Sequence, residues 1–131
     1  MGSFVAILML AMPLVSQDEK AEVPPWVVPP KAKQAFLEHH TFHSESMNAY
    51  GEKRYADAAA AVRRALEKHP DHAGLNYNYA CFATLAGEVD DETFAHLRRS
   101  VELRAQFRED ARRDDDFESV RDDPRFEQAL R

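Results

Sequence analysis

The sequence predicts an all-α protein made of antiparallel helical hairpins, and three observations support this prediction. Only four of the 131 residues are glycine, and the sequence is rich in alanine and arginine, which favour helices over strands. No proline occurs between Pro30 and Pro70, which leaves room for two helices joined by a turn. The motif at residues 63–67 returns in related form at residues 98–102, as expected when pairs of helices repeat along a chain.

The expected helices follow from apolar spacing and from residues that start or stop a helix. Residues 51–54 form the predicted turn between the first two helices. Gly87 ends the third helix because glycine readily adopts the left-handed conformation. Asp90 and Asp91 place acidic side chains at the start of the fourth helix. The four helices are therefore expected at residues 31–50, 55–68, 73–86 and 92–104.

Composition limits the classes of function. A chain of this length forms a single domain of ordinary size. The formal net charge is −6, which disfavours a nucleic-acid partner because such binding needs a basic surface. The single cysteine, Cys81, excludes an intrachain disulfide.

The N-terminal region differs from the rest of the chain. Residues 1–17 carry no charged side chain, and the apolar run Phe4–Val15 would be about 18 Å long as a helix, well short of the ~30 Å hydrocarbon core of a bilayer. This pattern predicts a signal peptide and an exported protein, periplasmic or secreted. The alternatives are an uncleaved anchor, which would be the protein's only link to a membrane, and a cytoplasmic protein whose start resembles a signal. Residues 18–31 form a Pro-rich linker that contains Trp26, and the helical domain spans 32–131.

The repeated motif resembles a known family. Residues 55–70, with the pattern Y-x2-A-x3-V-x2-A-x4-P, resemble the second helix of a tetratricopeptide repeat. Residues 77–87, with Y-N-Y-A-x2-A-x3-G, resemble the first helix of the next repeat. The sequence RDDPRF at residues 121–126 is similar to the closing segment of many bacterial tetratricopeptide proteins. The resemblance implies a right-handed superhelix with units at about 39–72 and 73–106 and a C-terminal capping segment at 107–131.

The same resemblance implies a function and a site. In this family the first helices of successive hairpins line a concave groove that takes a peptide or a partner helix. The chain is therefore expected to be a non-catalytic adaptor or assembly factor that binds a protein or peptide and needs no cofactor. Carried over by position, the groove would be lined by His43, Met47, Tyr50, Tyr77, Asn78, Cys81, Thr84, Arg112 and Arg113.

Other functions remain open at this stage. His39, His40 and His43 lie within about one helical turn and would be the ligands if the protein bound a metal, although further ligands are lacking. Cys81 is interpreted as a small buried residue rather than a nucleophile. Asp114–Asp116 lacks the glycine that a calcium loop requires, so these acids are expected to cap a short helix. A self-associating module, with Trp26 and an exposed hairpin edge forming a homodimer, is the other alternative.

Overall fold

A computed structural model describes the backbone of residues 30–131 and the side chains of residues 41–131. The described chain contains seven helices and no strand, which confirms the all-α prediction. The expectations for residues 1–17, and for the linker up to residue 29, lie outside the described residues. The helices are α1 (Pro30–Gly51), α2 (Tyr55–Lys68), α3 (Ala73–Leu85), α4 (Asp91–Leu103), α5 (Phe107–Arg113), the 3-10 helix η1 (Asp115–Val120) and α6 (Pro124–Ala129).

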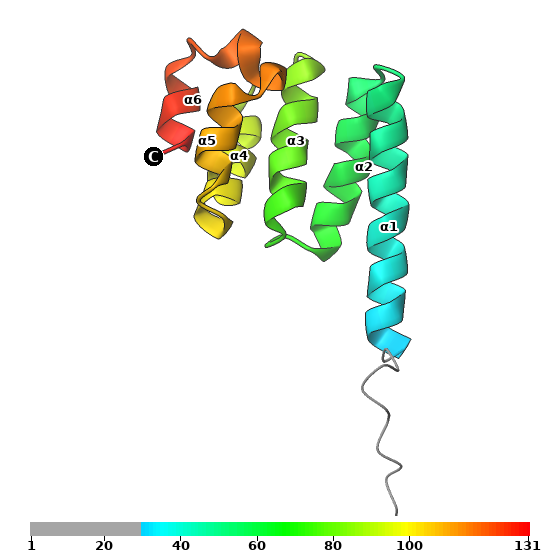
Figure 1. Ribbon diagram of the computed structural model, residues 1–131. Coiled ribbons are helices and arrows are strands. Elements are labelled where there is room, and N and C mark those ends of the chain that lie inside the picture. Colours follow the sequence, from blue (N-terminus) through cyan, green and yellow to red (C-terminus); the bar gives the residue numbers. More distant parts are fainter. Residues whose placement is uncertain (1–29) are drawn as a thin grey trace, which may run out of the picture.

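The first four helices stand side by side, each reversing the direction of the one before it (Figure 1). α1 packs mainly against α2, α2 against α3, and α3 against α4. After α4 the chain turns back, so that η1 packs on α3 while α5 and α6 pack on α4. None of the helices in the described part of the chain is both long and apolar enough to span a bilayer.

The helix ends follow from local residue chemistry. At the end of α3, Gly87 has φ +79°, and the amides of Gly87 and Glu88 bond back to the carbonyls of Thr84 and Ala83 at 3.0 and 2.9 Å. Asp90 accepts a hydrogen bond from the Thr93 amide, as its predicted capping role requires. These local signals explain why the predicted boundaries of α2, α3 and α4 agree with the structure within one residue.

The C-terminal helix has the same kind of start. Asp123 accepts from the Arg125 amide, and Pro124 occupies the first turn, where its missing N–H costs nothing. Both ends of α1 also differ from the prediction by one residue. α1 begins at Pro30, inside the predicted linker, because proline is also tolerated at a first helical position. Gly51 belongs to α1 rather than to the turn that follows it.

Small residues let the helices approach closely. Ala58 and Ala65 of α2 are fully buried, at 0% and 1% exposure, and so are their repeat counterparts Thr93 and Ser100 of α4, at 1% and 0%. The Thr93 hydroxyl donates to the Glu88 carbonyl at 2.6 Å, and Ser100 donates to the Leu97 carbonyl at 2.7 Å. Because each hydroxyl finds a partner nearby, these polar residues replace alanine without leaving a buried group unpaired.

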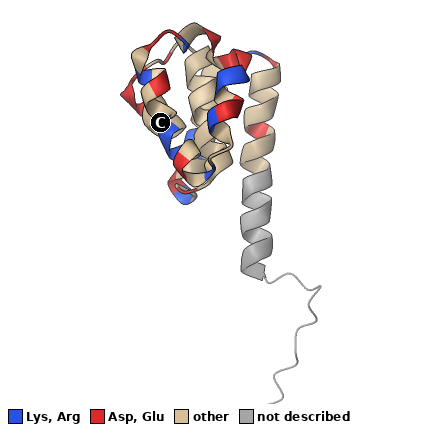
Figure 2. Ribbon diagram, turned by 60° about the vertical axis from the view of Figure 1, so that its left-hand side comes forward, with Lys and Arg blue, Asp and Glu red and all other residues tan. Residues whose placement is uncertain are grey.

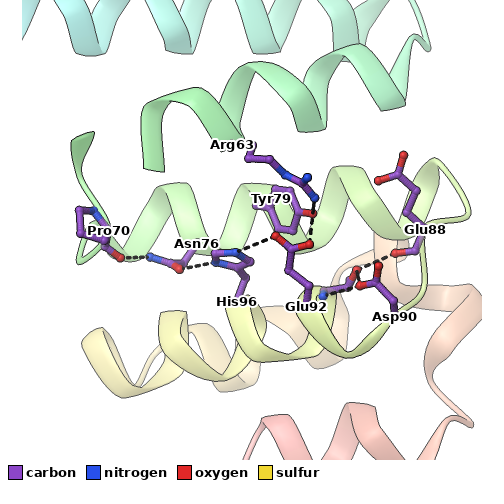
Figure 3. Close-up of polar contacts among 9 residues, drawn as sticks. Arg63, Pro70, Asn76, Tyr79, Glu88, Asp90, Glu92 and His96 are labelled. Carbon is purple, nitrogen blue, oxygen red and sulfur yellow. Dashed lines mark hydrogen bonds and ion pairs between the residues drawn. The ribbon is translucent and has the colours of Figure 1, made fainter. Parts of the chain in front are cut away.

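A set of polar side chains joins α2, α3 and α4 (Figure 3). We call this set the polar seam; it consists of Arg63, Asn76, Tyr79, Glu92 and His96. Arg63 of α2 donates to the Tyr79 hydroxyl and lies 3.0 Å from Glu92 of α4. The Tyr79 ring meets the His96 ring edge-on, with centroids 4.5 Å apart.

The other end of the polar seam is anchored on the backbone. Nδ1 of His96 lies 2.7 Å from Oδ1 of Asn76, so Nδ1 must carry the proton for this contact to be a hydrogen bond. The Asn76 amide nitrogen donates to the carbonyls of Pro70 and His72 at 2.9 and 3.0 Å. The buried Asn76 side chain therefore ties the start of α3 to α4 with its hydrogen-bonding capacity satisfied.

Candidate functional site

The predicted groove residues come from α1, α3 and the segment after α4. His43, Met47 and Tyr50 of α1 and Tyr77, Cys81 and Thr84 of α3 follow the i, i+4, i+7 spacing of one helix face. Because α2 reverses the chain once between them, α1 and α3 run in the same direction (Figure 1). They meet where the rings of Tyr50 and Phe82 lie 5.2 Å apart.

Two aspartates at the start of η1 close one end of this face. The Tyr77 hydroxyl donates to Oδ2 of Asp114 at 2.8 Å, and the Tyr50 hydroxyl donates to the Asp116 carboxylate at 3.2 Å. Sγ of Cys81 lies 3.9 Å from the same Asp114 oxygen. We call Tyr50, Tyr77, Cys81, Asp114 and Asp116 the tail junction. The structure thus brings three predicted site residues together, around two acids that were not among them.

Aromatic packing completes the cover over α3. The Tyr77 ring stacks on Phe107 at 4.5 Å and meets Phe117 edge-on at 5.7 Å. As a result Tyr77, Cys81 and Thr84 are only 8%, 3% and 4% exposed. The expectation that these three residues line an open groove is therefore wrong for this fold, because η1 packs on α3 at the place where the groove was expected.

The environment of the tail junction keeps its hydroxyl and thiol groups protonated. Burial, followed by the neighbouring Cys81 and Asp114, raises the pKa of the Tyr77 hydroxyl. Burial, followed by the charges of Asp114 and Asp116, raises the pKa of the Cys81 thiol well above its ordinary value. Burial, together with the charge of Asp114, also raises the pKa of the Asp116 carboxyl. A protonated, buried thiol is a poor nucleophile, so the geometry here suits a structural contact.

Two places in the chain carry residues of the kind that bind metal ions. Within the described residues, one ligand atom from each of Cys81, Asp114 and Asp116 lies within 4.8 Å of the others. Binding a metal there would require the thiolate, which the raised pKa of Cys81 opposes, and would compete with the hydrogen bonds from Tyr50 and Tyr77. In the histidine cluster, His43 is exposed, whereas the side chains of residues 39 and 40 lie outside the described part.

The remaining predicted residues are exposed or half-buried. Met47 is 40% exposed and is the one large hydrophobic side chain exposed within residues 41–131. Asn78 is half-buried, and its side-chain amide bonds to no other residue of the described chain. Arg112 lies 2.8 Å from Glu109 and 3.2 Å from Glu127. Arg113 is exposed and forms no ion pair within the described chain.

Sequence reasoning missed the role of Asp114 and Asp116 toward α1 and α3. It expected these acids to cap a helix, and Asp114 does cap η1, because its side chain accepts from the Asp116 amide at 3.0 Å. Their contacts with Tyr77 and Tyr50 join residues 37 and 66 positions apart in the chain. No periodicity or motif relates positions so far apart.

Comparisons with protein-family models, with curated proteins and with solved structures gave no match to this chain.

Proposed function

We propose that this protein is a small non-catalytic adaptor or assembly factor of the tetratricopeptide type. Its helical hairpins form a right-handed superhelix, and the segment from Phe107 onward acts as the C-terminal cap. The partner is a peptide or a helix of another protein, which binds on the side formed by α1 and α3. The recurrence of buried small residues between α2 and α4 and the burial of Phe117 and Phe126 support this proposal.

The single observation that best supports the binding site is the contrast between two neighbouring turns of α1 and α3. At one turn Tyr50 and Phe82 are in contact and the tail junction covers the face. One turn earlier on each helix are Met47 and Asn78, which are three and four residues before Tyr50 and Phe82. There the apolar Met47 side chain is exposed and the Asn78 amide has no partner within the described residues.

These two side chains offer complementary contacts to a peptide. A thioether side chain adapts its shape to different apolar groups. The Asn78 amide both donates and accepts, so it can bond to the backbone of a bound segment irrespective of its sequence. Exposed His43, one turn before Met47 on α1, adds a polar contact at the margin. The short surface predicts modest affinity, in the micromolar range.

The test is site-specific photo-crosslinking in the native host. A photoreactive amino acid at position 47 should capture a partner that is then identified by mass spectrometry. With the purified partner, Met47→Asp combined with Asn78→Ala should weaken binding about tenfold or more by calorimetry, because it removes the apolar contact and the backbone clamp.

The matched control is Glu67→Ala, which alters an exposed residue on the outer face of α2 and should leave the affinity unchanged. Tyr77→Ala would be a poor test, because this buried residue supports the fold. The proposal fails if the double variant binds the partner as tightly as the wild type. It also fails if a photoreactive amino acid at position 67 captures the partner and one at position 47 does not.

A further inference from the structure

A second surface lies on the face made by α4 and α6. Two hollows of about 440 and 240 Å³ open there, and both are lined by Arg98 and Gln128. Shared lining residues make the hollows adjacent parts of one depression. We call it the α4–α6 trough; Arg108 and Arg131 line one half of it, and Arg125 lines the other.

The α4–α6 trough is lined by both basic and acidic side chains. Basic and acidic residues alternate over the described ribbon rather than forming a face of one sign (Figure 2). The acids that line the trough, Asp91 and Glu102, are already engaged, since Asp91 lies 3.2 Å from Arg125 and Glu102 lies 3.1 Å from Arg99. Arg98, at the junction of the two hollows, makes no ion pair or hydrogen bond with any residue of the described chain.

The surroundings of Arg98 are held in place. The Arg125 guanidinium lies over the Phe94 ring, 4.7 Å from its centroid, and is held by Asp123 at 2.8 Å. At the other half of the trough, Arg108 donates to the Leu130 carbonyl at 2.6 Å. A ligand would therefore meet a fixed wall of arginines already bonded within the chain, beside one arginine, Arg98, whose guanidinium has no partner in the described residues.

A third hollow differs from the trough because both of its arginines are already paired with carboxylates. The depression of about 300 Å³ beside α2 is also lined by two arginines, Arg63 and Arg64. There Arg63 lies 3.0 Å from Glu92, and Arg64 lies 2.7 Å from Glu45. An acidic ligand would have to displace these carboxylates, whereas at Arg98 it would displace only water.

We propose that the α4–α6 trough is a docking surface for a short acidic segment of a partner protein. A glutamate or aspartate carboxylate pairs with the Arg98 guanidinium, which can donate two parallel hydrogen bonds. Neighbouring acids of the same segment are attracted by the Arg131 guanidinium, and its apolar side chains lie against exposed Ala95. This surface is separate from Met47 and Asn78, so it does not depend on the function proposed above.

The experiment uses the full chain and two fluorescent peptides that differ only in charge. One contains four glutamates around a leucine, and in the other each glutamate is replaced by glutamine. Fluorescence anisotropy should show micromolar binding of the glutamate peptide, at least tenfold weaker binding of the glutamine peptide, and weakening at high salt. Arg98→Ala should reduce the affinity for the glutamate peptide about tenfold, and Arg98→Gln should do the same.

The matched control is Arg113→Ala, which removes another exposed arginine without an ion pair in the described chain, one that lines neither hollow of the trough. It should leave the affinity unchanged, as should Met47→Asp, which tests the other surface. Equal binding of the two peptides, unchanged affinity in both Arg98 variants, or loss of binding in Arg113→Ala would overturn the proposal. Displacement of the peptide by a single-stranded oligonucleotide more readily than by a second acidic peptide would also overturn it.

Discussion

Lys53 occupies a backbone conformation that side chains rarely adopt. Its φ is +57°, in the left-handed region, just after α1 ends at Gly51. The amides of Lys53 and Arg54 bond back to the carbonyls of Tyr50 and Ala49 at 2.9 and 2.8 Å. This is the hydrogen-bond pattern that Gly87 completes after α3, but here the left-handed position holds a lysine. The sequence places its glycine two residues too early for this position.

Lys53→Gly should therefore raise the free energy of unfolding by about 0.5–1 kcal/mol, because glycine adopts positive φ without a Cβ clash. Urea unfolding followed by circular dichroism measures the change. Lys53→Ala is the control, since alanine retains the Cβ and should give no comparable gain. Equal stability of the glycine and alanine variants would show that the conformation of residue 53 is not strained.

At the scale of the elements, the packing of α3 against α4 depends on a half-buried histidine. Burial lowers the pKa of His96, and nearby Arg63 lowers it further, while Glu92 acts in the opposite direction. The neutral ring is the form that the fold favours. Since Nδ1 already donates to Asn76 at 2.7 Å, a second proton goes to Nε2, where the Glu92 carboxylate at 3.9 Å only partly offsets the cost of charging a half-buried ring.

The sign of the pH dependence follows from this lowered pKa. Below about pH 6.5, the ordinary pKa of histidine, the unfolded chain takes up a proton at His96 before the folded chain does. The His96 contribution to stability is therefore complete above about pH 6.5 and is lost as the pH falls toward the folded-state pKa. Unfolding free energies measured at pH 7.5 and 5.5 should differ more for the wild type than for His96→Gln.

The control for this measurement is His43→Gln, because His43 is an exposed histidine on α1. It should leave the pH dependence of stability unchanged. If His96→Gln and the wild type lose the same stability between the two pH values, another group is responsible for the dependence.

At the scale of the whole molecule, the C-terminal segment contributes to the same core as the helical stack. Phe117 and Phe126 are 1% and 2% exposed, with ring centroids 5.5 Å apart, and Phe117 also meets Tyr77 of α3. Because η1 packs on α3 and α6 packs on α4, the segment bridges the second helical hairpin. We therefore expect the stack and the segment to unfold together.

Phe117→Ala should lower the free energy of unfolding by about 3–5 kcal/mol, the usual range for truncating a fully buried phenylalanine. It should also speed the reaction of Cys81 with a thiol reagent under native conditions, because the cover over α3 is loosened. Met47→Ala is the control, since this side chain is 40% exposed and its loss should change neither quantity much. A stable Phe117→Ala variant with an unreactive Cys81 would contradict the prediction.

Helix boundaries could be predicted from the sequence where they depend on residues a few positions away in the chain. The bounds of α2, α3 and α4 were predicted within one residue, because Gly87 and Asp90 act on the backbone a few residues away. In the last segment, Phe117 and Phe126 are large apolar residues in the sequence, and both are buried. The sequence did not indicate that Lys53 takes the left-handed conformation after α1, because the glycine nearby, Gly51, still belongs to the helix.

By itself the sequence determined that this chain forms helices, where most of them begin and end, and which faces are apolar, since these properties arise from contacts over one or two turns. Only the tertiary structure decided which of the predicted site residues stay open. It placed Asp114 against Tyr77 and covered Cys81, while it left Met47 and Asn78 on the surface. The physical reason is that these contacts join residues tens of positions apart, and their formation depends on how the last segment folds back on α3.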